Sequence, residues 1–464
     1  MKTTITFQPA ILAGAFVGMM TLSGCASDDD AVEVKNPVET TIENNSKEEP
    51  TEEETPQTPD QDNPNANKPE ESYSSPIFGL TRNERQDIAA SNDFAFNLFR
   101  NINNAKQQQG KDCIISPISL TYVLGMLNTG ATGDTQKEIC NLLGFGNDDK
   151  EGLNALCKKM IDKAPTADEA VKLQLANCIA IDKSAELEEQ YKKETADSYS
   201  AEVASLEFDQ QSAVDYVNDW CNRHTGGMIP KIVDKLNGVM ALMNATYFKG
   251  PWSCTFDPKE TADESFTRED GTRLTVPMMH RQGAAYYAAN KQYKTLGMPY
   301  GKGRNWLFYA LLPNEGYQVD DIIASLSNQS WEENIHHIKS YIQYQAGGNE
   351  VDIKMPRFKV ESEVTLNDIL STMGAASMFA NKGEFTLISK NYKDLFVDVI
   401  RQKAAIEVTE EGTEAAALTI AEMDGDDGDG VNSIPKFYAT RPFIYMIQEM
   451  ETGAIFFMGV YRGI

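Results

Sequence analysis

Apolar residues recur three and four positions apart in the first half of the chain, which is typical of helices with one buried face. The predicted helices cover residues 92–102, 118–127, 131–143 and 212–221. Ser116 stands at the capping position of the second helix and Pro117 in its first turn.

The second half carries shorter apolar runs that are typical of strands. These runs cover residues 239–248, 307–312, 351–355, 443–447 and 455–460. The first run is mostly apolar, which predicts a strand that is buried on both faces except at Asn244 and Thr246. The run 351–355 alternates, so we expect it to be half exposed. Helices first and strands later predict a mixed α+β domain.

The N-terminus carries an apolar run over residues 10–22 that is too short to span a bilayer as a helix. It follows Lys2 and ends Leu22-Ser23-Gly24-Cys25. A positive start, a short apolar run and small residues predict a secretory signal. The ending resembles a bacterial lipobox, so we expect residues 1–24 to be removed and Cys25 to be lipidated. An ordinary secreted protein with a chance cysteine is the alternative.

The acidic residues 28–30 resemble the surface-export signal of outer-membrane lipoproteins in some Gram-negative bacteria. We therefore expect an outer-membrane lipoprotein exposed on the cell surface, with retention on the inner leaflet as the alternative. Its contact with the membrane is then the lipid anchor alone.

Residues 25–78 differ in composition from the rest of the chain. From residue 26 they hold 15 acidic and 3 basic residues and seven prolines, a local charge of −12. Such a segment cannot bury enough apolar surface to fold, so we expect a disordered, extended tether. Residues 79–464 contain no comparable stretch, and predict one large, monomeric domain.

The charge and the scarcity of histidine exclude several functions. The 464-residue chain has 42 Lys and Arg against 69 Asp and Glu, a net charge of −27 that argues against binding nucleic acid. With four histidines and no nucleophile motif, we expect no enzyme.

We also expect no cofactor and no metal. Residues 424–430 resemble a calcium loop but lack its fifth-position acid, and Pro435 stands where the twelfth-position Glu belongs. A flexible acidic turn is favoured over a weak calcium site. The six cysteines after Cys25 lack zinc spacing and lie mostly among apolar neighbours. We therefore expect buried thiols, although disulfides that the sequence cannot pair are an alternative.

A series of motifs runs through the domain in a fixed order. They read CIISPIS (113–119), GATGDT (130–135), MNATYFKG (243–250) with Trp252 and Phe256, VPMM (276–279), MPRFKVES (355–362), MGAASMF (373–379), EEGTEAAA (410–417) and RPF (441–443). In this order and at these separations they resemble the serpin family of serine protease inhibitors.

This resemblance implies an α+β serpin fold of three β-sheets, about eight to nine helices and an exposed reactive-centre loop, here at about 410–440. In inhibitory members a protease cuts the loop and is trapped as a covalent acyl-enzyme. The loop then inserts into the central sheet as an extra strand, so the native state is metastable.

The residues themselves suit insertion, because alternate side chains of a strand face opposite sides. With Thr413 facing inward, the inward set is uncharged: Thr413, Ala415, Ala417, Thr419, Ala421, Met423 and Gly425. Every charge falls on the other set: Glu414, Ala416, Leu418, Ile420, Glu422, Asp424 and Asp426. The pattern breaks at Asp427, where an inward carboxylate would cost several kcal/mol.

The resemblance also implies a hinge, and Gly412 can change its backbone angles freely there. The hinge residues are Glu411, Gly412, Thr413, Glu414, Ala415, Ala416 and Ala417. The family's spacing puts the reactive bond at Asp426–Asp427, with Asp424 or Met423 as alternative residues before the cut. No Lys or Arg lies between Lys403 and Lys436, so a protease that requires a basic residue is not expected. The candidates are an acidic-specific protease, or an elastase-like or papain-like one that uses Ile420, Ala421 or Met423.

In this family a polar cluster beneath the central sheet controls its opening. The matching positions are Ser116, Ser119 and Asn244, while Gln402 replaces the family's histidine. Gln402 could bridge Ser and Asn but cannot become cationic. Trp252 matches the aromatic residue at the top of the sheet, where insertion begins.

We therefore expect a surface-tethered suicide inhibitor of serine, or of cysteine, endopeptidases. A non-inhibitory serpin that only binds, with residues 410–422 as a surface helix, is the alternative. A glycan-capture lipoprotein would explain the lipobox but not residues 411–416.

Overall fold

The structure, a computed structural model, describes residues 14–23, 76–146, 149–344, 350–380, 384–413 and 434–464. Within these residues the chain folds into nine α-helices and three β-sheets, which confirms the predicted α+β class. The helices are α1 (Arg82–Asn104), α2 (Pro117–Gly130), α3 (Gly133–Leu143), α4 (Lys150–Lys163), α5 (Glu189–Tyr199), α6 (Gln211–His224), α7 (Val319–Ser325), α8 (Asn328–Tyr344) and α9 (Asn367–Thr372).

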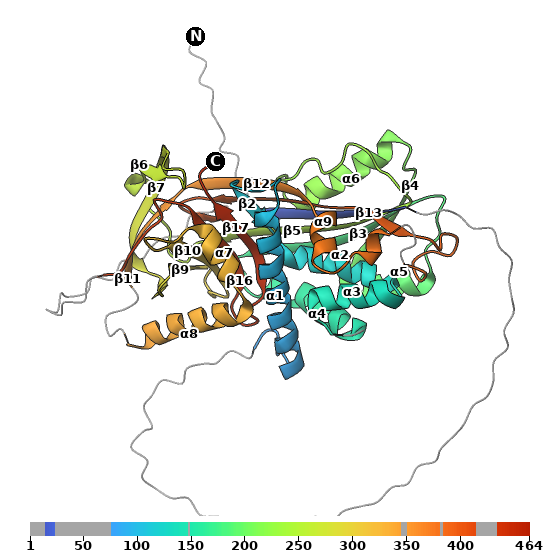
Figure 1. The fold of residues 1–464 in the computed structure, drawn as a ribbon, viewed down its shortest axis with the longest axis horizontal. Helices are drawn as coiled ribbons and strands as arrows, with labels where there is room; N and C mark the ends of the chain where they lie inside the picture. Colours follow the sequence, from blue (N-terminus) through green and yellow to red (C-terminus); the bar gives the residue numbers. More distant parts are fainter. Residues whose placement is uncertain (1–13, 24–75, 147–148, 345–349, 381–383, 414–433) are drawn as a thin grey trace, which may run out of the picture.

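The central sheet has the strand order β12-β13-β1-β5-β3-β4, and the short β14 also pairs with β5. Its strands are β1 (Gly14–Ser23), β3 (Lys172–Asp182), β4 (Ala201–Leu206), β5 (Met240–Pro251), β12 (Phe358–Thr365), β13 (Phe396–Val408) and β14 (Gly412–Thr413). Its pairs are antiparallel except β3 with β4. Helix α6 lies on one face, and α2 to α5 lie on the other (Figure 1).

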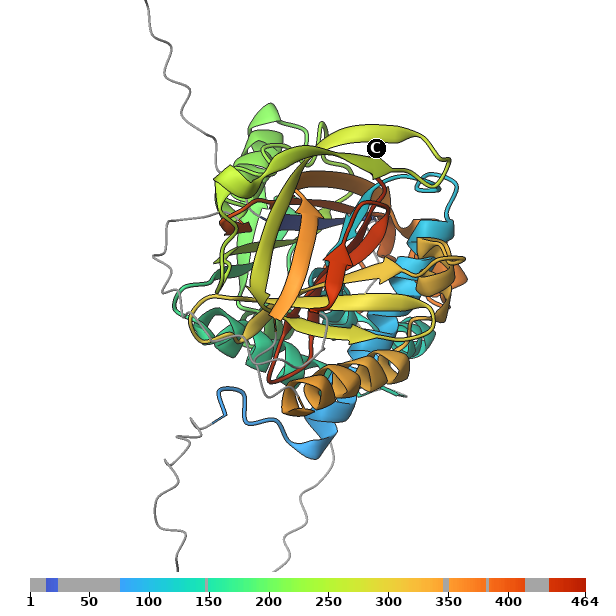
Figure 2. The same cartoon turned by 90° about the vertical axis from the view of Figure 1, so that its left-hand side faces the viewer.

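Two further sheets lie beside the central one. The six-stranded sheet has the order β2-β17-β16-β10-β9-β8 and the four-stranded sheet the order β15-β11-β7-β6. Figure 2 shows the orange strand β11 beside the yellow-green β7, with which it pairs. The bounds are β2 (Cys113–Ile115), β6 (Ala262–Thr267), β7 (Arg273–Ala284), β8 (Tyr286–Ala289), β9 (Tyr293–Tyr300), β10 (Trp306–Pro313), β11 (Glu350–Pro356), β15 (Lys436–Tyr438), β16 (Phe443–Glu449) and β17 (Ile455–Tyr461).

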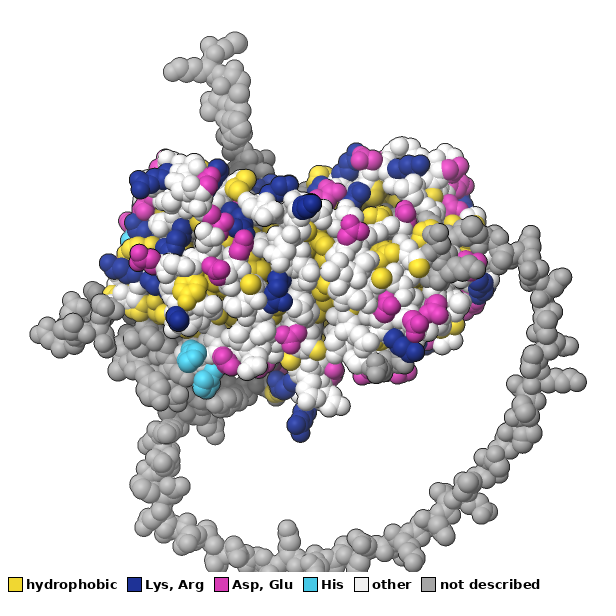
Figure 3. Space-filling view, in the orientation of Figure 1, with side chains coloured by type: hydrophobic (Ala, Val, Ile, Leu, Met, Phe, Trp, Pro, Cys, Tyr) yellow, Lys and Arg dark blue, Asp and Glu magenta, His cyan; other side chains and the backbone are white. Residues whose placement is uncertain are grey.

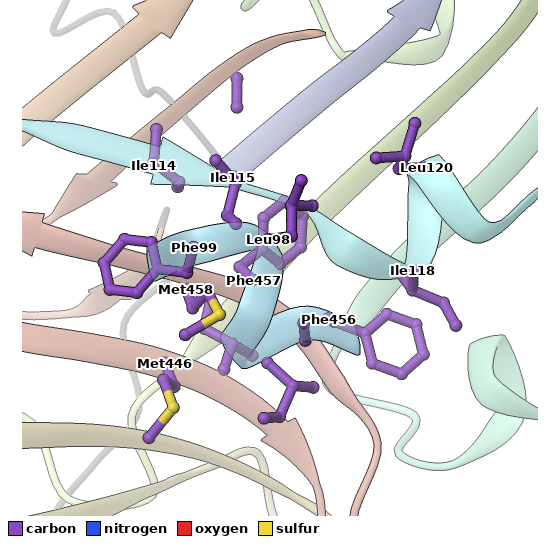
Figure 4. Close-up of a cluster of buried hydrophobic side chains, with 14 of the residues drawn as sticks. Leu98, Phe99, Ile114, Ile115, Ile118, Leu120, Met446, Phe456, Phe457 and Met458 are labelled. Carbon is purple, nitrogen blue, oxygen red and sulfur yellow. The ribbon is translucent and has the colours of Figure 1, made fainter. Parts of the chain in front are cut away.

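The main core lies where α1 crosses the six-stranded sheet. Leu98 and Phe99 of α1 are buried there, near Ile115 of β2 and Met458 of β17 (Figure 4). The apolar residues of α1 that the sequence pattern placed on one face are therefore the ones that pack into this core.

Strand β5 separates two apolar clusters. Its residues Met240, Leu242 and Phe248 belong to the main core. Its alternate residues, from Ala241 to Tyr247, join a second cluster with side chains of α6. Alternation along the strand thus assigns even-numbered β5 residues to the α2 side and odd-numbered ones to the α6 side.

Two sequence predictions are corrected here. Asn244 and Thr246 are as fully buried as the apolar residues of β5, because they hydrogen-bond to each other and to polar groups beneath the sheet. Ser116 stands at the N-cap of α2, but its hydroxyl does not cap the helix and donates instead to the Ser119 hydroxyl at 3.1 Å.

The described chain packs against the body just before α1 begins. Phe78 and Leu80 are buried, and the backbone N–H groups of Ile77 and Phe78 donate to the Glu451 carboxylate at 2.7 and 2.9 Å. Basic and acidic side chains are interspersed over the face shown in Figure 3. No helix among the described residues combines the length and the apolar composition needed to cross a bilayer.

Candidate functional site: the hinge and the adjoining strand position

A tight turn joins β13 to β14 at the top of the central sheet. The Thr409 N–H donates to the Gly412 carbonyl at 3.0 Å, which closes the turn around Glu410 and Glu411. Gly412 has φ +146°, and a Cβ there would meet the Gly250 carbonyl oxygen at 2.3 Å. Only glycine fits this close approach of two backbones.

Glu410 fixes the turn from inside. Its side chain is buried, and it accepts hydrogen bonds from the Arg357 guanidinium and from the Thr261 hydroxyl, the latter at 2.8 Å. Burial alone would raise the pKa of Glu410, but these hydrogen bonds and the Arg357 charge outweigh it, so the pKa lies below its ordinary value. The turn is therefore held by a carboxylate.

Thr413 is the last described residue before the loop, and it already belongs to the sheet. It pairs with Gly250 of β5, is 0% exposed, and its hydroxyl lies 2.7 Å from the Tyr300 hydroxyl. Tyr300 stacks on Trp252 at 4.4 Å between ring centroids. The hinge therefore rests on a buried aromatic pair.

Trp252 lies against the turn that joins β13 to β14. Its indole N–H donates to the Thr409 carbonyl and its backbone N–H to the Glu411 carbonyl, each at 2.9 Å. Its side chain is thus both part of the core and a support for the turn.

Between β5 and β13 the central sheet has room for one strand, and β1 fills it. Strand β1 is antiparallel to both neighbours. Gly18 stands midway, paired with Asn244 of β5 on one side and with Gln402 of β13 on the other.

A chain of neutral hydrogen bonds runs beneath this position. The Ser119 and Thr246 hydroxyls are 2.5 Å apart, and Thr246 donates to the Asn244 amide oxygen at 3.1 Å. Asn244 in turn donates to Asn177 of β3 at 2.9 Å. Ser116, Ser119 and Asn244 are thus connected, with Thr246 as the link.

Gln402 does not bridge Ser and Asn side chains as its chemistry would allow. Its amide nitrogen donates to the Ser116 backbone carbonyl at 3.1 Å, and its amide oxygen has no hydrogen-bond partner among the described residues. The reason is geometric, because β1 lies between Gln402 and Asn244.

The other end of the loop enters β15, an edge strand. It pairs in parallel with Asp352, Ile353 and Lys354 of β11. The Tyr438 hydroxyl donates to the Asp352 carboxylate, whose other oxygen lies 3.0 Å from His280 Nε2. Burial alone would raise the pKa of Asp352, but the hydrogen bonds with Tyr438 and His280 outweigh it and lower that pKa. The bond to Asp352 raises the pKa of Tyr438 to about 12.

Comparison with known proteins decides the family. The family model for "Serpin (serine protease inhibitor)" matches residues 89–463. The chain belongs to the serpin family. Among its relatives, chicken (Gallus gallus) neuroserpin is 29% identical over 79% of this chain and 89% of its own length. Serpin-Z10 of Arabidopsis thaliana is 30% identical over 81% of this chain and 97% of its own.

Solved serpin structures share the fold. The thermophilic serpin tengpin in its native state matches with a TM-score of 0.71 and 27% identity, over 82% of this chain and 94% of that one. Human thyroxine-binding globulin, solved with bound thyroxine, also gives a TM-score of 0.71, at 26% identity over 81% of this chain and 98% of that one. The serpin fold with its three sheets is thereby established for this chain.

Several predicted residues lie outside the described part of this serpin. They are Cys25, Glu414, Ala415, Ala416, Ala417, Met423, Asp424, Asp426 and Asp427, together with the acidic segment 424–430. Sequence reasoning also missed four residues that the structure brings to the site. These are Asn177, Thr246, Tyr300 and Arg357. Thr246 and Arg357 stand inside motifs that the sequence analysis quoted, so only their contacts were hidden.

No disulfide joins the six cysteines that the structure describes, and five of them are buried. Among the described residues no group of three or more His, Cys, Asp or Glu side chains lies close enough to hold a metal ion.

Proposed function

We propose that this serpin is a suicide inhibitor of serine or cysteine endopeptidases. The protease cuts the loop and forms an ester or thioester with its new carboxyl end. The severed loop then enters the central sheet and carries the protease with it before the acyl bond is hydrolysed. Strand addition of this kind satisfies the backbone groups of both neighbours, and serpin loop insertion is itself a recognised example.

The observation that carries the proposal is the register of β14. Thr413 pairs with Gly250, and its hydroxyl contacts the Tyr300 hydroxyl in the buried interior. A loop that continued in this register would place Ala415 opposite Phe248 and Thr419 opposite Asn244. Even-numbered β5 residues face the α2 side, so the uncharged set of loop residues would face the main core.

The charged set would face the side covered by α6. Glu414 would lie opposite Lys249, a favourable cross-strand pair, and Glu422 opposite Ala241. The assignment of inward and outward residues thus follows from two separate arguments, the charge pattern of the loop and the register of its hinge.

The target follows from the loop's chemistry. Residues 404–435 carry no basic side chain, which disfavours proteases with an acidic specificity pocket. We propose cleavage at Asp426–Asp427, with cleavage after Asp424 or Met423 as the alternative. The proposed place of action is the outer surface of a Gram-negative bacterium, with lipidated Cys25 as the anchor and residues 26–78 as the tether.

The test uses residues 76–464 with elastase-like, acidic-specific and papain-like proteases in turn. We expect an adduct that survives SDS, together with release of a C-terminal peptide whose mass gives the cleaved bond. Cleavage without an adduct by every protease would reject inhibition and leave the serpin fold untouched.

A binding function is the second candidate, and one feature favours it. A pocket of about 360 Å³ lies between α1, α8 and β16 and is lined in part by Asn92, Trp331 and Gln448. The structural relative thyroxine-binding globulin carries a small ligand, thyroxine. Cleavage without an adduct in the protease test would shift the balance to this candidate.

A further inference from the structure

The N-terminal apolar segment belongs to the fold in this structure. Strand β1 lies in the interior of the central sheet and pairs along its length with β5 on one side and β13 on the other (dark blue in Figure 1). The interpretation of this segment as a secretion signal alone does not explain the pairing.

The register of β1 along β5 coincides with that of the hinge. Strand β14 pairs Gly412 with Pro251, and β1 pairs Gly14 with Phe248, three residues further along β5. Because paired residues advance one for one, Gly14 occupies the place that Ala415 would take in a loop continuing from Gly412.

The register along β13 gives the same answer independently. The turn places Gly412 opposite Thr409, and β1 pairs Ala15 with Ala405, four residues further along β13. Ala15 therefore occupies the place of Ala416, in agreement with the count along β5. By the same count Gly18 takes the place of Thr419, and Thr21 that of Glu422, after which the pairing of β1 with β13 shifts by one residue.

The two segments cannot occupy this position together. A strand inside a sheet uses the N–H and C=O groups of both neighbours, and one strand saturates them. The part of the loop from Ala415 to Glu422 needs the same β5 and β13 groups that β1 uses.

We propose that the gap between β5 and β13 is a binding site for the chain's own residues Gly14–Ser23, and that this segment excludes the cleaved loop. A chain that keeps the segment is then cut as a substrate, and removal of residues 1–24 frees the site and makes the serpin inhibitory. This inference rests on the proposed loop insertion.

The test compares two full-length chains that both carry Cys25→Ser, which prevents processing at the lipobox. One has Met19→Pro, in the middle of β1. Proline removes a ladder N–H and is excluded from central strands, so β1 leaves the sheet. The matched control has Ala26→Pro, beyond the end of β1. Amide exchange of β5 and β13 reports occupancy, and the shift of the melting temperature on clipping the loop reports insertion.

We expect slow exchange in the control and fast exchange in the Met19→Pro chain before clipping. On clipping, the Met19→Pro chain should gain roughly 10 °C or more in melting temperature, whereas the control gains none. Only the Met19→Pro chain should then form an SDS-stable adduct.

Two outcomes overturn the inference and differ from failure of the proposed function. Equal exchange in both intact chains shows that β1 does not occupy the gap. An equal gain on clipping shows that the loop displaces β1, and leaves the proposed inhibition standing. If neither chain gains stability, the proposed loop insertion is wrong, and β1 then has no loop to exclude. The exchange data still report whether β1 is bound.

Discussion

The two ends of the reactive-centre loop are attached in opposite ways. The N-terminal end enters through a turn that holds Glu410, which is 5% exposed, and then through Thr413, which is 0% exposed and pairs with β5 in the central sheet. The C-terminal end enters β15, which pairs with three residues of β11 at the edge of the four-stranded sheet. Under the proposed mechanism the first attachment would lengthen residue by residue along β5 once β1 has left, whereas the second would stay limited to its edge position beside β11.

This difference assigns separate tasks to the two ends. Under the proposed mechanism, contacts at the Thr413 end would control whether the cleaved loop can enter the sheet. Contacts at the Tyr438 end would anchor the peptide that stays behind after the proposed cleavage. The following substitutions test that division, in order of decreasing effect.

Thr413→Arg is expected to reduce the adduct yield roughly tenfold or more, because an inward guanidinium without a partner costs several kcal/mol at a fully buried position. The variant should be cut as a substrate. Glu411→Arg places the same charge at an exposed position two residues earlier and should leave the adduct yield near the parent value. Equal yields from the two variants would refute the inward assignment of Thr413.

Glu410→Gln should lower the free energy of unfolding by about 1–2 kcal/mol at pH 7, since it weakens charged hydrogen bonds to the partly exposed Arg357. The pKa of Glu410 is lowered in the folded state, so its stabilisation is present above its unfolded pKa, near 4.3, and is lost as the pH falls through the folded pKa. The difference between parent and variant should therefore shrink below about pH 4.

Urea unfolding from pH 3 to 7 measures this difference, with Glu411→Gln as the exposed control. A difference that stays constant down to pH 3 would show that the charge of Glu410 does not hold the turn.

Gln402→His should make stability depend on pH at the centre of the sheet. Burial disfavours the cation and lowers the pKa of a histidine there, so stability would fall by up to about 1.4 kcal/mol per pH unit below about pH 6.5. Gln402→Asn, which cannot titrate, should keep the parent profile. Chemical unfolding at pH 5, 6, 7 and 8 compares the three proteins, and identical profiles would contradict a closed, buried environment for residue 402.

Tyr438→Phe should have the smallest effect, about 1 kcal/mol or less, because it removes one hydrogen bond near an edge strand. The lowered pKa of Asp352 means that this contribution is present above its unfolded pKa, near 3.9, and is lost as the pH falls through the folded pKa. Acid unfolding of parent and variant should therefore converge below about pH 4. A loss of adduct yield as large as that of Thr413→Arg would contradict the division between the two ends.

Much of the fold could be predicted from the sequence. The run 307–312 predicted β10, and the pattern from Asn92 predicted the buried face of α1, because periodicity reports local burial. The motif around Gly412 was recognisable because it stands in the family's order, and the hinge role that it implies stays a prediction.

Long-range partners were not predictable. Glu410 and Arg357 lie 53 residues apart, and Thr413 and Tyr300 lie 113 apart, so no local pattern connects them. The same holds for β1, because a short apolar run fits both a secretion signal and a central strand. Periodicity indicates which side chains are buried, but it does not indicate which residues they pack against.

The proposed inhibition requires that the severed loop enter the central sheet. Thermal unfolding of residues 76–464, before and after clipping of the loop, tests it most directly. We expect the clipped protein to melt roughly 10 °C or more above the intact one, because the inserted strand adds backbone pairing and buried surface. Equal melting temperatures for the two forms would contradict it.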